Sequence, residues 1–183
     1  MDKYTKEQAK KVWLISDTHF YHTNIIKYCE RPFENVSVMN DVLLANWNNT
    51  IGVEDVVYFL GDLAFGKGSP KPQQIIQGLN GKIIWVKGSH DRGIGEVSQT
   101  VSNVQRVVLF DDIEYEDWCF KLVHNPRNLV KANGWVIHGH THNTTPFIDL
   151  KARRVNVSVE HIGYTPISLY DVIKKLNKKI KGS

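Results

Sequence analysis

The chain has 183 residues, of which 42% are hydrophobic and 23% charged, and its formal net charge is +4. This composition excludes a disordered or fibrous protein, and no apolar stretch reaches the length of a membrane span. The length suits one domain, so we expect residues 1–183 to form a single domain. The N-terminus lacks the apolar run of a secretory signal, which predicts a cytoplasmic protein.

Cysteine and lysine usage narrow the functional class further. Cys29 and Cys119 form no C-x-x-C pair, which argues against zinc-ribbon or thioredoxin-like chemistry. The excess positive charge is concentrated in a C-terminal run of five lysines between residues 174 and 181. A solvated terminal helix explains such a run better than a nucleic-acid surface does. A nucleic-acid partner is therefore not indicated, and we expect no membrane partner.

The first half of the chain alternates strand-like and helical patterns. Apolar, β-prone runs at residues 12–16, 55–60 and 82–87 predict strands. Helices are predicted at residues 24–29 and 38–47, and a third from Pro70 and Pro72 to its end at Asn80-Gly81. Repeated β-then-α units favour parallel strands with right-handed crossovers.

The second half has a β-rich pattern. Strands are predicted at residues 104–110, 113–116, 118–123, 134–137, 147–150 and 154–159, with turns at 111–112, 133–134 and 143–146. We expect these strands to pair mostly antiparallel. Residues 169–179 form a final amphipathic helix. The whole pattern predicts an α/β protein: an αββα sandwich of two mixed β-sheets flanked by helices.

Potential metal ligands follow most of the predicted strands. They are Asp17 and His19, Asp62, the segment Ser89-His90-Asp91, His124, and His140 with His142. Side chains two residues apart in an extended segment point the same way, which makes Asp17/His19 and His140/His142 natural chelating pairs. Either pair alone is more often a surface or core histidine motif, and Asp62 and Asp91 also suit helix N-caps. Five clusters at strand ends together predict one shared site.

The ordered set D-x-H, G-D, G-x-H-D, a lone His and G-H-T-H spans Asp17 to His142. This set resembles the calcineurin-like metallophosphoesterase superfamily, and the short length is similar to its small uncapped bacterial, archaeal and phage phosphoesterases. The resemblance implies one metal held by Asp17, His19, Asp62 and His142. It implies a second held by Asp62, position 89, His124 and His140, with Asp62 as the bridge.

The implied cofactors are two divalent transition-metal ions. Carboxylate and imidazole ligands without thiolate favour Mn, Fe, Co, Ni or Zn over Mg or Ca, and we expect Mn. Ser89 departs from the family motif G-N-H-D, in which Asn supplies an amide oxygen. Three explanations stay open: drift with a bridging water, a serine that ligates directly, or a substitution introduced to weaken the enzyme.

The resemblance implies hydrolysis of a small or nucleotide-derived phosphodiester by metal-activated hydroxide, with His90 as the general acid. No cap domain is visible in the sequence, so we expect an open cleft. An open cleft suits phosphodiesters better than phosphomonoesters as substrates. Asp91 is counted with His90 as a candidate catalytic residue, which either orients His90 or holds the backbone. Asn24, Arg31 and Arg92 are candidate substrate contacts, since arginine grips phosphate bidentately. A surface salt bridge is the plainer alternative for Arg31.

Other functions compete with this interpretation. Residues 61–67 fit G-x-x-x-x-G-K, but Gly68 replaces the Ser or Thr that a P-loop needs. A nuclease would need an extended basic groove. A non-enzymatic scaffold is a third candidate, since a retromer subunit that resembles the family lacks the catalytic histidine. His90 argues against the scaffold, whereas Ser89 argues slightly for it.

Overall fold

Two mixed β-sheets organise the chain, which a computed structural model describes over residues 1–66, 69–91, 94, 97–128 and 132–182. The five-stranded sheet runs in the order β11 (Ile167–Ser168), β2 (Val12–Ile15), β3 (Val56–Phe59), β4 (Lys82–Val86) and β5 (Val104–Val108). The six-stranded sheet runs in the order β1 (Asp2–Tyr4), β6 (Phe110–Tyr115), β7 (Trp118–Val123), β8 (Trp135–His138), β10 (Arg154–Asn156) and β9 (Ile148–Asp149).

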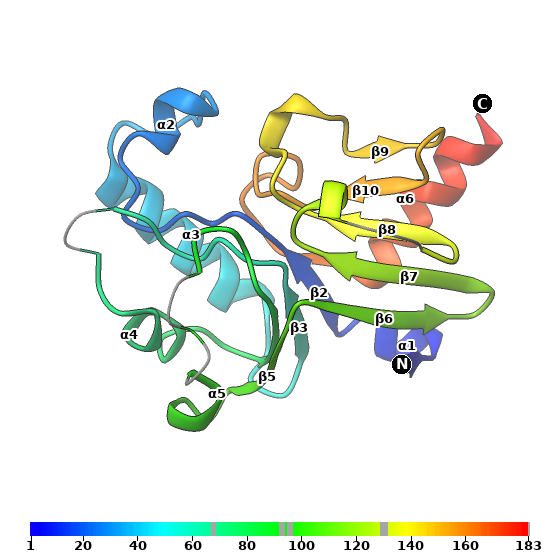
Figure 1. Cartoon of the computed structure of the whole chain (residues 1–183), viewed down its shortest axis with the longest axis horizontal. Coiled ribbons are helices and arrows are strands. Elements are labelled where there is room, and N and C mark those ends of the chain that lie inside the picture. The colour runs from blue at the N-terminus through cyan, green and yellow to red at the C-terminus, as the bar shows by residue number, and fades with distance from the viewer. Residues whose placement is uncertain (67–68, 92–93, 95–96, 129–131, 183) are drawn as a thin grey trace.

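Helices flank the two sheets. They are α1 (Lys6–Ala9), α2 (Ile25–Tyr28), α3 (Val36–Thr50), α4 (Pro72–Ile76), α5 (Val97–Thr100) and α6 (Leu169–Lys181), with short 3-10 turns η2 (Pro126–Asn128) and η3 (His142–Thr144). Figure 1 shows α3, α4 and α5 on the side of the five-stranded sheet, and α6 behind the six-stranded sheet. This arrangement confirms the predicted α/β sandwich of two mixed sheets flanked by helices.

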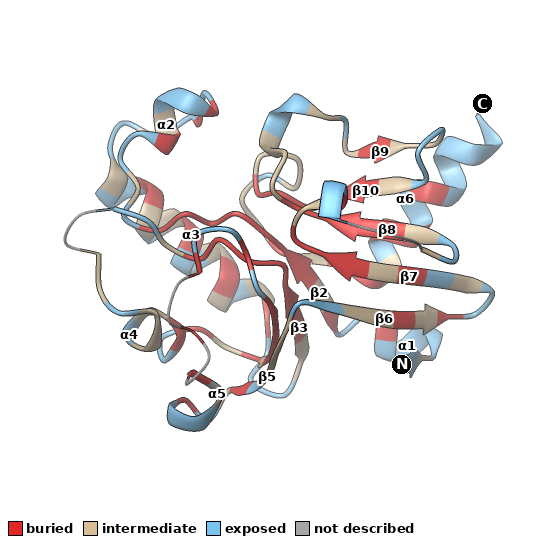
Figure 2. Ribbon diagram, viewed as in Figure 1, coloured by how far each residue is buried: buried red, intermediate tan, exposed pale blue. Residues whose placement is uncertain are grey.

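The central strands β2, β3 and β4 are buried on both faces, which explains their continuous apolar sequences. Along β3, Val57 and Phe59 belong to the core cluster shared with α3, whereas Tyr58 belongs to the cluster shared with the other sheet. Along β4, Ile83 and Trp85 alternate in the same way with their neighbours. Figure 2 shows this buried centre. Polar groups that follow these strands are therefore positioned by a rigid interior.

Capping residues fix where the two long helices begin. Asn35 caps α3 by accepting the N–H of Val38, and Ser168 caps α6 by accepting the N–H of Asp171. Each cap satisfies a backbone donor that would otherwise have no partner, and is worth about 1 kcal/mol. Among the described residues, no helix has the length and apolarity needed to cross a lipid bilayer.

The structure corrects two predictions about the second half. Residues 111–112 are not a turn but part of β6, and the chain crosses between the sheets at Leu109, since β5 and β6 belong to different sheets. The six-stranded sheet is also not mostly antiparallel, because β1/β6, β7/β8 and β8/β10 pair parallel and only β6/β7 and β9/β10 pair antiparallel. The short elements β1, α1, α5 and β11 were not predicted.

Candidate functional site

The predicted ligand residues lie at the carboxyl ends of five strands. Asp17 and His19 follow β2, Asp62 follows β3, and Ser89 to Asp91 follow β4. In the other sheet His124 follows β7, and His140 and His142 follow β8. Strands β2, β3 and β4 pair parallel, as do β7 and β8, so within each set the carboxyl ends lie at one edge. A parallel bridge between Ser16 and Ser158 ties these edges together.

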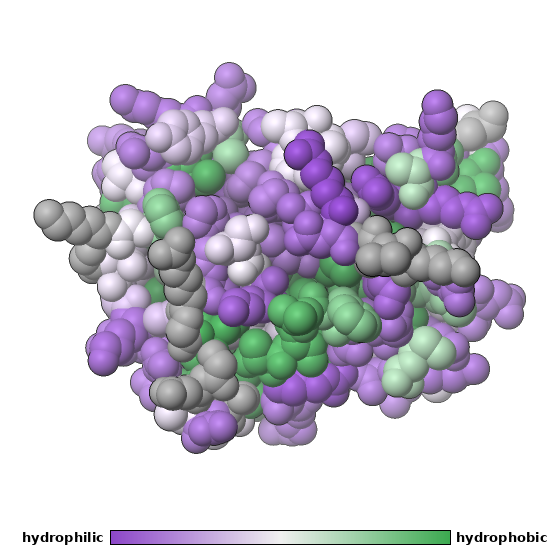
Figure 3. Space-filling view, viewed as in Figure 1, coloured by the Kyte–Doolittle hydropathy of each residue, from purple (hydrophilic) through white to green (hydrophobic). Residues whose placement is uncertain are grey.

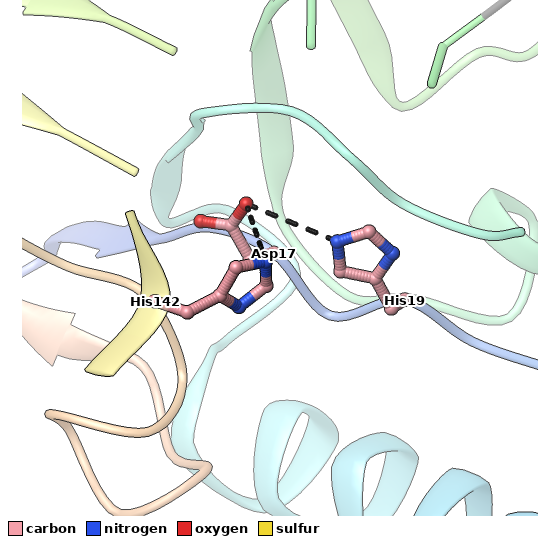
Figure 4. Close-up of side chains that lie close together, drawn as sticks. All are labelled: Asp17, His19 and His142. Atoms are coloured by element: carbon pink, nitrogen blue, oxygen red, sulfur yellow. Dashed lines mark ion pairs between the residues drawn. The ribbon is translucent and has the colours of Figure 1, made fainter. Parts of the chain in front are cut away.

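The first ligand group consists of Asp17, His19 and His142 (Figure 4). Asp17 Oδ1 lies 4.0 Å from His19 Nε2 and 3.9 Å from His142 Nε2. Its other carboxylate oxygen accepts hydrogen bonds from the backbone N–H of His140 and the hydroxyl of Ser158. One oxygen is thus fixed by the protein while the other faces two imidazole nitrogens.

The second ligand group consists of Asp62, His124 and His140. His124 Nε2 lies 3.3 Å from Asp62 Oδ2 and 3.1 Å from His140 Nδ1. The opposite nitrogen of His124, Nδ1, donates to the backbone carbonyl of Leu60 at 2.8 Å. This hydrogen bond occupies Nδ1 and directs Nε2 toward the group, as in many metal-binding histidines.

Asp62 joins the two groups. Its Oδ2 lies 3.3 Å from His124 of the second group and 3.7 Å from His19 of the first. Burial alone would raise the pKa of Asp62, but the hydrogen bond and charge of His124 outweigh it and lower the pKa to about 2. An ionised carboxylate placed between two sets of imidazoles suits a bridging ligand.

Several buried polar atoms of the site have no hydrogen-bond partner among the described residues. They include Asp17 Oδ1 and both ring nitrogens of His19. Unpaired buried polar atoms are costly, so their presence together indicates that a ligand satisfies them. Burial also lowers the pKa values of His19 and His140, which favours the neutral imidazole that binds metal. These donors fit divalent transition metals.

Backbone conformation at the site is unusual. Five of the predicted ligands adopt the left-handed region with φ between 45° and 68°: Asp17, His19, Asp62, His140 and His142. This region costs a non-glycine residue about 1–3 kcal/mol and is concentrated at functional sites. The strained backbone at these five residues directs their side chains toward the candidate site.

Two glycines permit the close approach of the loops. A Cβ atom at Gly139 would collide with Ser16 Oγ and Asp17 Oδ2, and one at Gly88 would collide with Asp62 Oδ1. The G-x-H-D and G-H-T-H motifs therefore need their first glycine for steric reasons. The two ligand carboxylates occupy the space that a side chain would fill.

The three residues that follow β4, Ser89 to Asp91, lie in three different environments. Ser89 Oγ lies 3.4 Å from His140 Nδ1, beside the second group. His90 is 42% exposed in its side chain, and its Nε2 lies 4.0 Å from Asp62 Oδ2. His90 packs against the ring of Phe65 with centroids 4.6 Å apart.

Asp91 holds the backbone, and among the described residues no hydrogen bond joins its carboxylate to His90. Its buried carboxylate accepts the N–H groups of Asp62, Leu63 and Gly88 and the indole N–H of Trp85, at 2.7–3.0 Å. Of the two roles expected for Asp91, these bonds support the one in which it holds the backbone, which makes it a positioning residue. Asp91 connects the loop that carries Asp62 to the loop that carries His90.

Arg31 is buried, and its guanidinium is used by the protein itself. It donates to Glu160 Oε1 at 2.8 and 3.0 Å and to the carbonyls of Asp17 and Thr18 at 2.7 and 2.8 Å. These bonds contradict the prediction that Arg31 grips a phosphate. The surface salt bridge considered as its alternative is in fact a buried one, with side-chain exposures of 0% and 5%.

Glu160 is the important residue that sequence reasoning missed. Its Oε1 accepts the Nδ1–H of His142 at 3.0 Å as well as the Arg31 hydrogen bonds. Burial alone would raise its pKa, but His142 and Arg31 lower it to about 2, and His142 has a raised pKa in return. An acid directly after the predicted strand at 154–159 was the available signal, the same signal that identified Asp62.

The remaining candidates have weaker structural support. Asn24 is exposed at the start of α2 and makes no side-chain capping hydrogen bond, so its contact with substrate remains a prediction. Arg92 lies outside the described residues, as do Lys67 and Gly68 of the P-loop-like segment. His161 Nε2 donates to the carbonyl of His142 at 2.9 Å, which gives it a supporting role.

Comparisons with known proteins agree with the geometry. The family described as calcineurin-like phosphoesterase matches residues 10–181. The uncharacterised protein MJ1445 of Methanocaldococcus jannaschii is 46% identical over 179 residues, covering 94% of each chain.

Among solved structures, the protein of unknown function AQ665 from Aquifex aeolicus has a TM-score of 0.67 at 25% identity, covering 89% of this chain and 97% of its own. A structure described as a novel archaeal phosphodiesterase is more distant, with a TM-score of 0.47 at 21% identity, covering 79% of this chain and 81% of its own. The phosphodiesterase description belongs to that protein.

Proposed function

Because the chain belongs to the calcineurin-like phosphoesterase family, we propose that it hydrolyses a phosphodiester with two divalent transition-metal ions, Mn foremost. Asp17, His19, Asp62 and His142 would hold one ion, and Asp62, Ser89, His124 and His140 the other. The observation that carries this proposal is the position of Asp62 Oδ2, within 3.3–3.7 Å of an imidazole from each group. When bound, such ions neutralise charge on the phosphoryl oxygens and lower the pKa of the attacking water.

The protein's own residues would orient the metal-binding carboxylates and supply a proton to the leaving group. Asp17 and Asp62 are each fixed at one oxygen by backbone N–H groups, so their free oxygens keep a defined direction. His90 Nε2 lies 4.0 Å from Asp62 Oδ2 and is open to solvent, a position from which it can protonate the departing alkoxide. Asp91 holds the two loops together and so fixes the spacing between His90 and Asp62.

The test is hydrolysis of bis(p-nitrophenyl) phosphate and p-nitrophenyl phosphate with Mn, Fe, Ni, Co, Zn or Mg supplied separately. We expect metal-dependent turnover that is faster on the diester. His90→Ala should lower kcat by about 10²- to 10⁴-fold, the usual contribution of a general acid. Its metal content should match the wild type, because His90 is not assigned as a ligand. Turnover that is unchanged in His90→Ala would contradict the assignment.

A scaffold role is the second candidate, and the exposed Ser89 in place of asparagine is the observation that favours it. Metal analysis separates the two functions. A protein that binds no divalent ion and hydrolyses neither ester would support the scaffold. Cleavage of DNA or RNA in preference to small diesters would instead indicate a nuclease.

A further inference from the structure

A cavity of about 320 Å³ opens directly beside the second ligand group. Ser89 and His124 line it, so it is continuous with the candidate metal site. Its volume falls at the lower end of the range for small-molecule sites, about 300–1,000 Å³. A group held in this cavity would lie next to a phosphate bound at the candidate metal site, close enough to be one of its ester substituents.

Two large apolar side chains line the cavity without being buried by the fold. Leu109 is 74% exposed and Phe110 is 56% exposed, and they are consecutive at the crossing between β5 and β6. Figure 3 shows an apolar patch on this face, over the region where β5 leads into β6. Adjacent exposed apolar side chains next to a candidate active site indicate a binding surface more than chance exposure.

Polar groups complete the cavity lining. Lys87, Asn125 and Asn128 contribute a cation and two amides. The Asn125 Oδ1 atom accepts the N–H of Arg127 at 2.9 Å, so the NH₂ group of the Asn125 amide is the part that can donate to a ligand. The combination of an apolar surface, amide donors and one cation suits a flat ring with a polar edge attached to an anionic phosphate.

We propose that this cavity binds the nucleoside of a nucleotide phosphodiester, with the base against Leu109 and Phe110 and its polar edge toward Asn125. This inference rests on the proposed function and specifies its substrate class. A lipid-like ester is disfavoured because a long alkyl chain would leave Lys87 and the two amides without partners. An extended nucleic acid is disfavoured because the cavity holds about one nucleoside.

The test compares three diesters with the same leaving group: the p-nitrophenyl esters of thymidine 5′-monophosphate, of methyl phosphate and of octyl phosphate. With Mn-loaded protein, kcat/KM should be about 5- to 150-fold higher for the thymidine ester than for the methyl ester, the range that base stacking on an aromatic ring gives. Phe110→Ser and Leu109→Ser should each reduce this ratio. Equal rates on the thymidine and methyl esters, or a preference for the octyl ester, would overturn the proposal.

Val53→Ser is the matched control. Val53 is 67% exposed but precedes β3, at the opposite end of that strand from Asp62, so its replacement should leave the ratio unchanged. Thermal unfolding of each variant reports whether it folds. If either Phe110→Ser or Leu109→Ser fails to fold, the other still tests the proposal.

Binding distinguishes failure of the pocket from failure of the proposed function. Calorimetric titration with thymidine 5′-monophosphate should give tighter binding than methyl phosphate, and Phe110→Ser should weaken it by about fivefold or more. If no ester is hydrolysed but this difference persists, the proposed function fails and the nucleoside site stands. If the wild type binds both phosphates equally, the nucleoside site is refuted whatever the activity.

Discussion

The two ligand groups differ in what holds them in place. In the first group, His142 is oriented by Glu160, which is itself paired with the buried Arg31. In the second group, His124 is oriented by a backbone carbonyl. Ser89, the proposed further ligand of the second ion, is exposed. The first group is thus set by a buried charge network, whereas the second relies on backbone contacts and one short hydroxyl side chain.

This difference predicts unequal affinities for metal. A supporting carboxylate raises the basicity of a ligating imidazole and fixes its direction, so its loss typically lowers affinity by about 10- to 100-fold. His142 has such a carboxylate in Glu160, whereas His140 has none among the described residues. We therefore expect the first ion to bind more tightly than the second, an order that substitutions in each group can test.

Asp62→Asn should have the largest effect, because Asp62 is the residue proposed to hold both ions. An amide cannot supply an ionised bridging oxygen, so both ions should be lost or weakened together, and turnover should fall by about 10³-fold or more. Metal content measured by mass spectrometry and diester hydrolysis check this. Asp117→Asn, in an exposed turn, is the control. A variant that loses one ion but keeps the other would show that Asp62 does not bridge.

Glu160→Gln should separate the two groups. Removing the charge leaves the buried Arg31 cation without its carboxylate, which should lower the free energy of unfolding by about 3–5 kcal/mol. The first group should lose metal affinity by about 10- to 100-fold, while the second changes little. Urea unfolding and metal titration measure the two effects. An equal loss of metal affinity at both groups would contradict the view that Glu160 supports the first group alone.

Stability in acid should report on the same network. Glu160 has its pKa lowered from an ordinary 4.5 to about 2, so the unfolded chain binds more protons than the folded chain between these values. Its contribution is complete above pH 4.5 and is lost as the pH falls through 2, with a size on the order of 3 kcal/mol. Unfolding of the metal-free protein between pH 5 and 2 should therefore be less pH-dependent in Glu160→Gln. Parallel curves for the two proteins would refute this.

The sequence predicted the positions of the ligands because short-range patterns encode them. Continuous apolar runs identified β2, β3 and β4, and polar residues placed directly after a parallel strand necessarily meet at one edge of the sheet. This rule alone places Asp17 and Asp62 at the same edge. The short edge strands β1 and β11 are not predictable in this way, because two or three residues carry no periodicity.

Long-range pairing could not be predicted in the same way. Arg31 and Glu160 lie 129 residues apart, and no local pattern indicates that one neutralises the other. An arginine close behind a metal motif suits a phosphate contact and a buried ion pair equally well. The change of sheet at Leu109 is not predictable for a related reason, since the apolar run through residues 107–110 contains no turn residue at that point.

Ser89→Asn should have the smallest effect and test the second group alone. An asparagine reaches further than a serine and offers an amide oxygen, so the second ion should bind about tenfold more tightly and turnover should rise. Ser89→Ala is the matched variant: if the hydroxyl ligates directly, its removal should lower second-site occupancy, whereas a bridging water would leave occupancy unchanged. Calorimetric titration with Mn gives the stoichiometry for all three proteins. Identical titration endpoints with identical rates for serine and asparagine would show that position 89 does not limit the second site, and the unequal affinities would then need another cause.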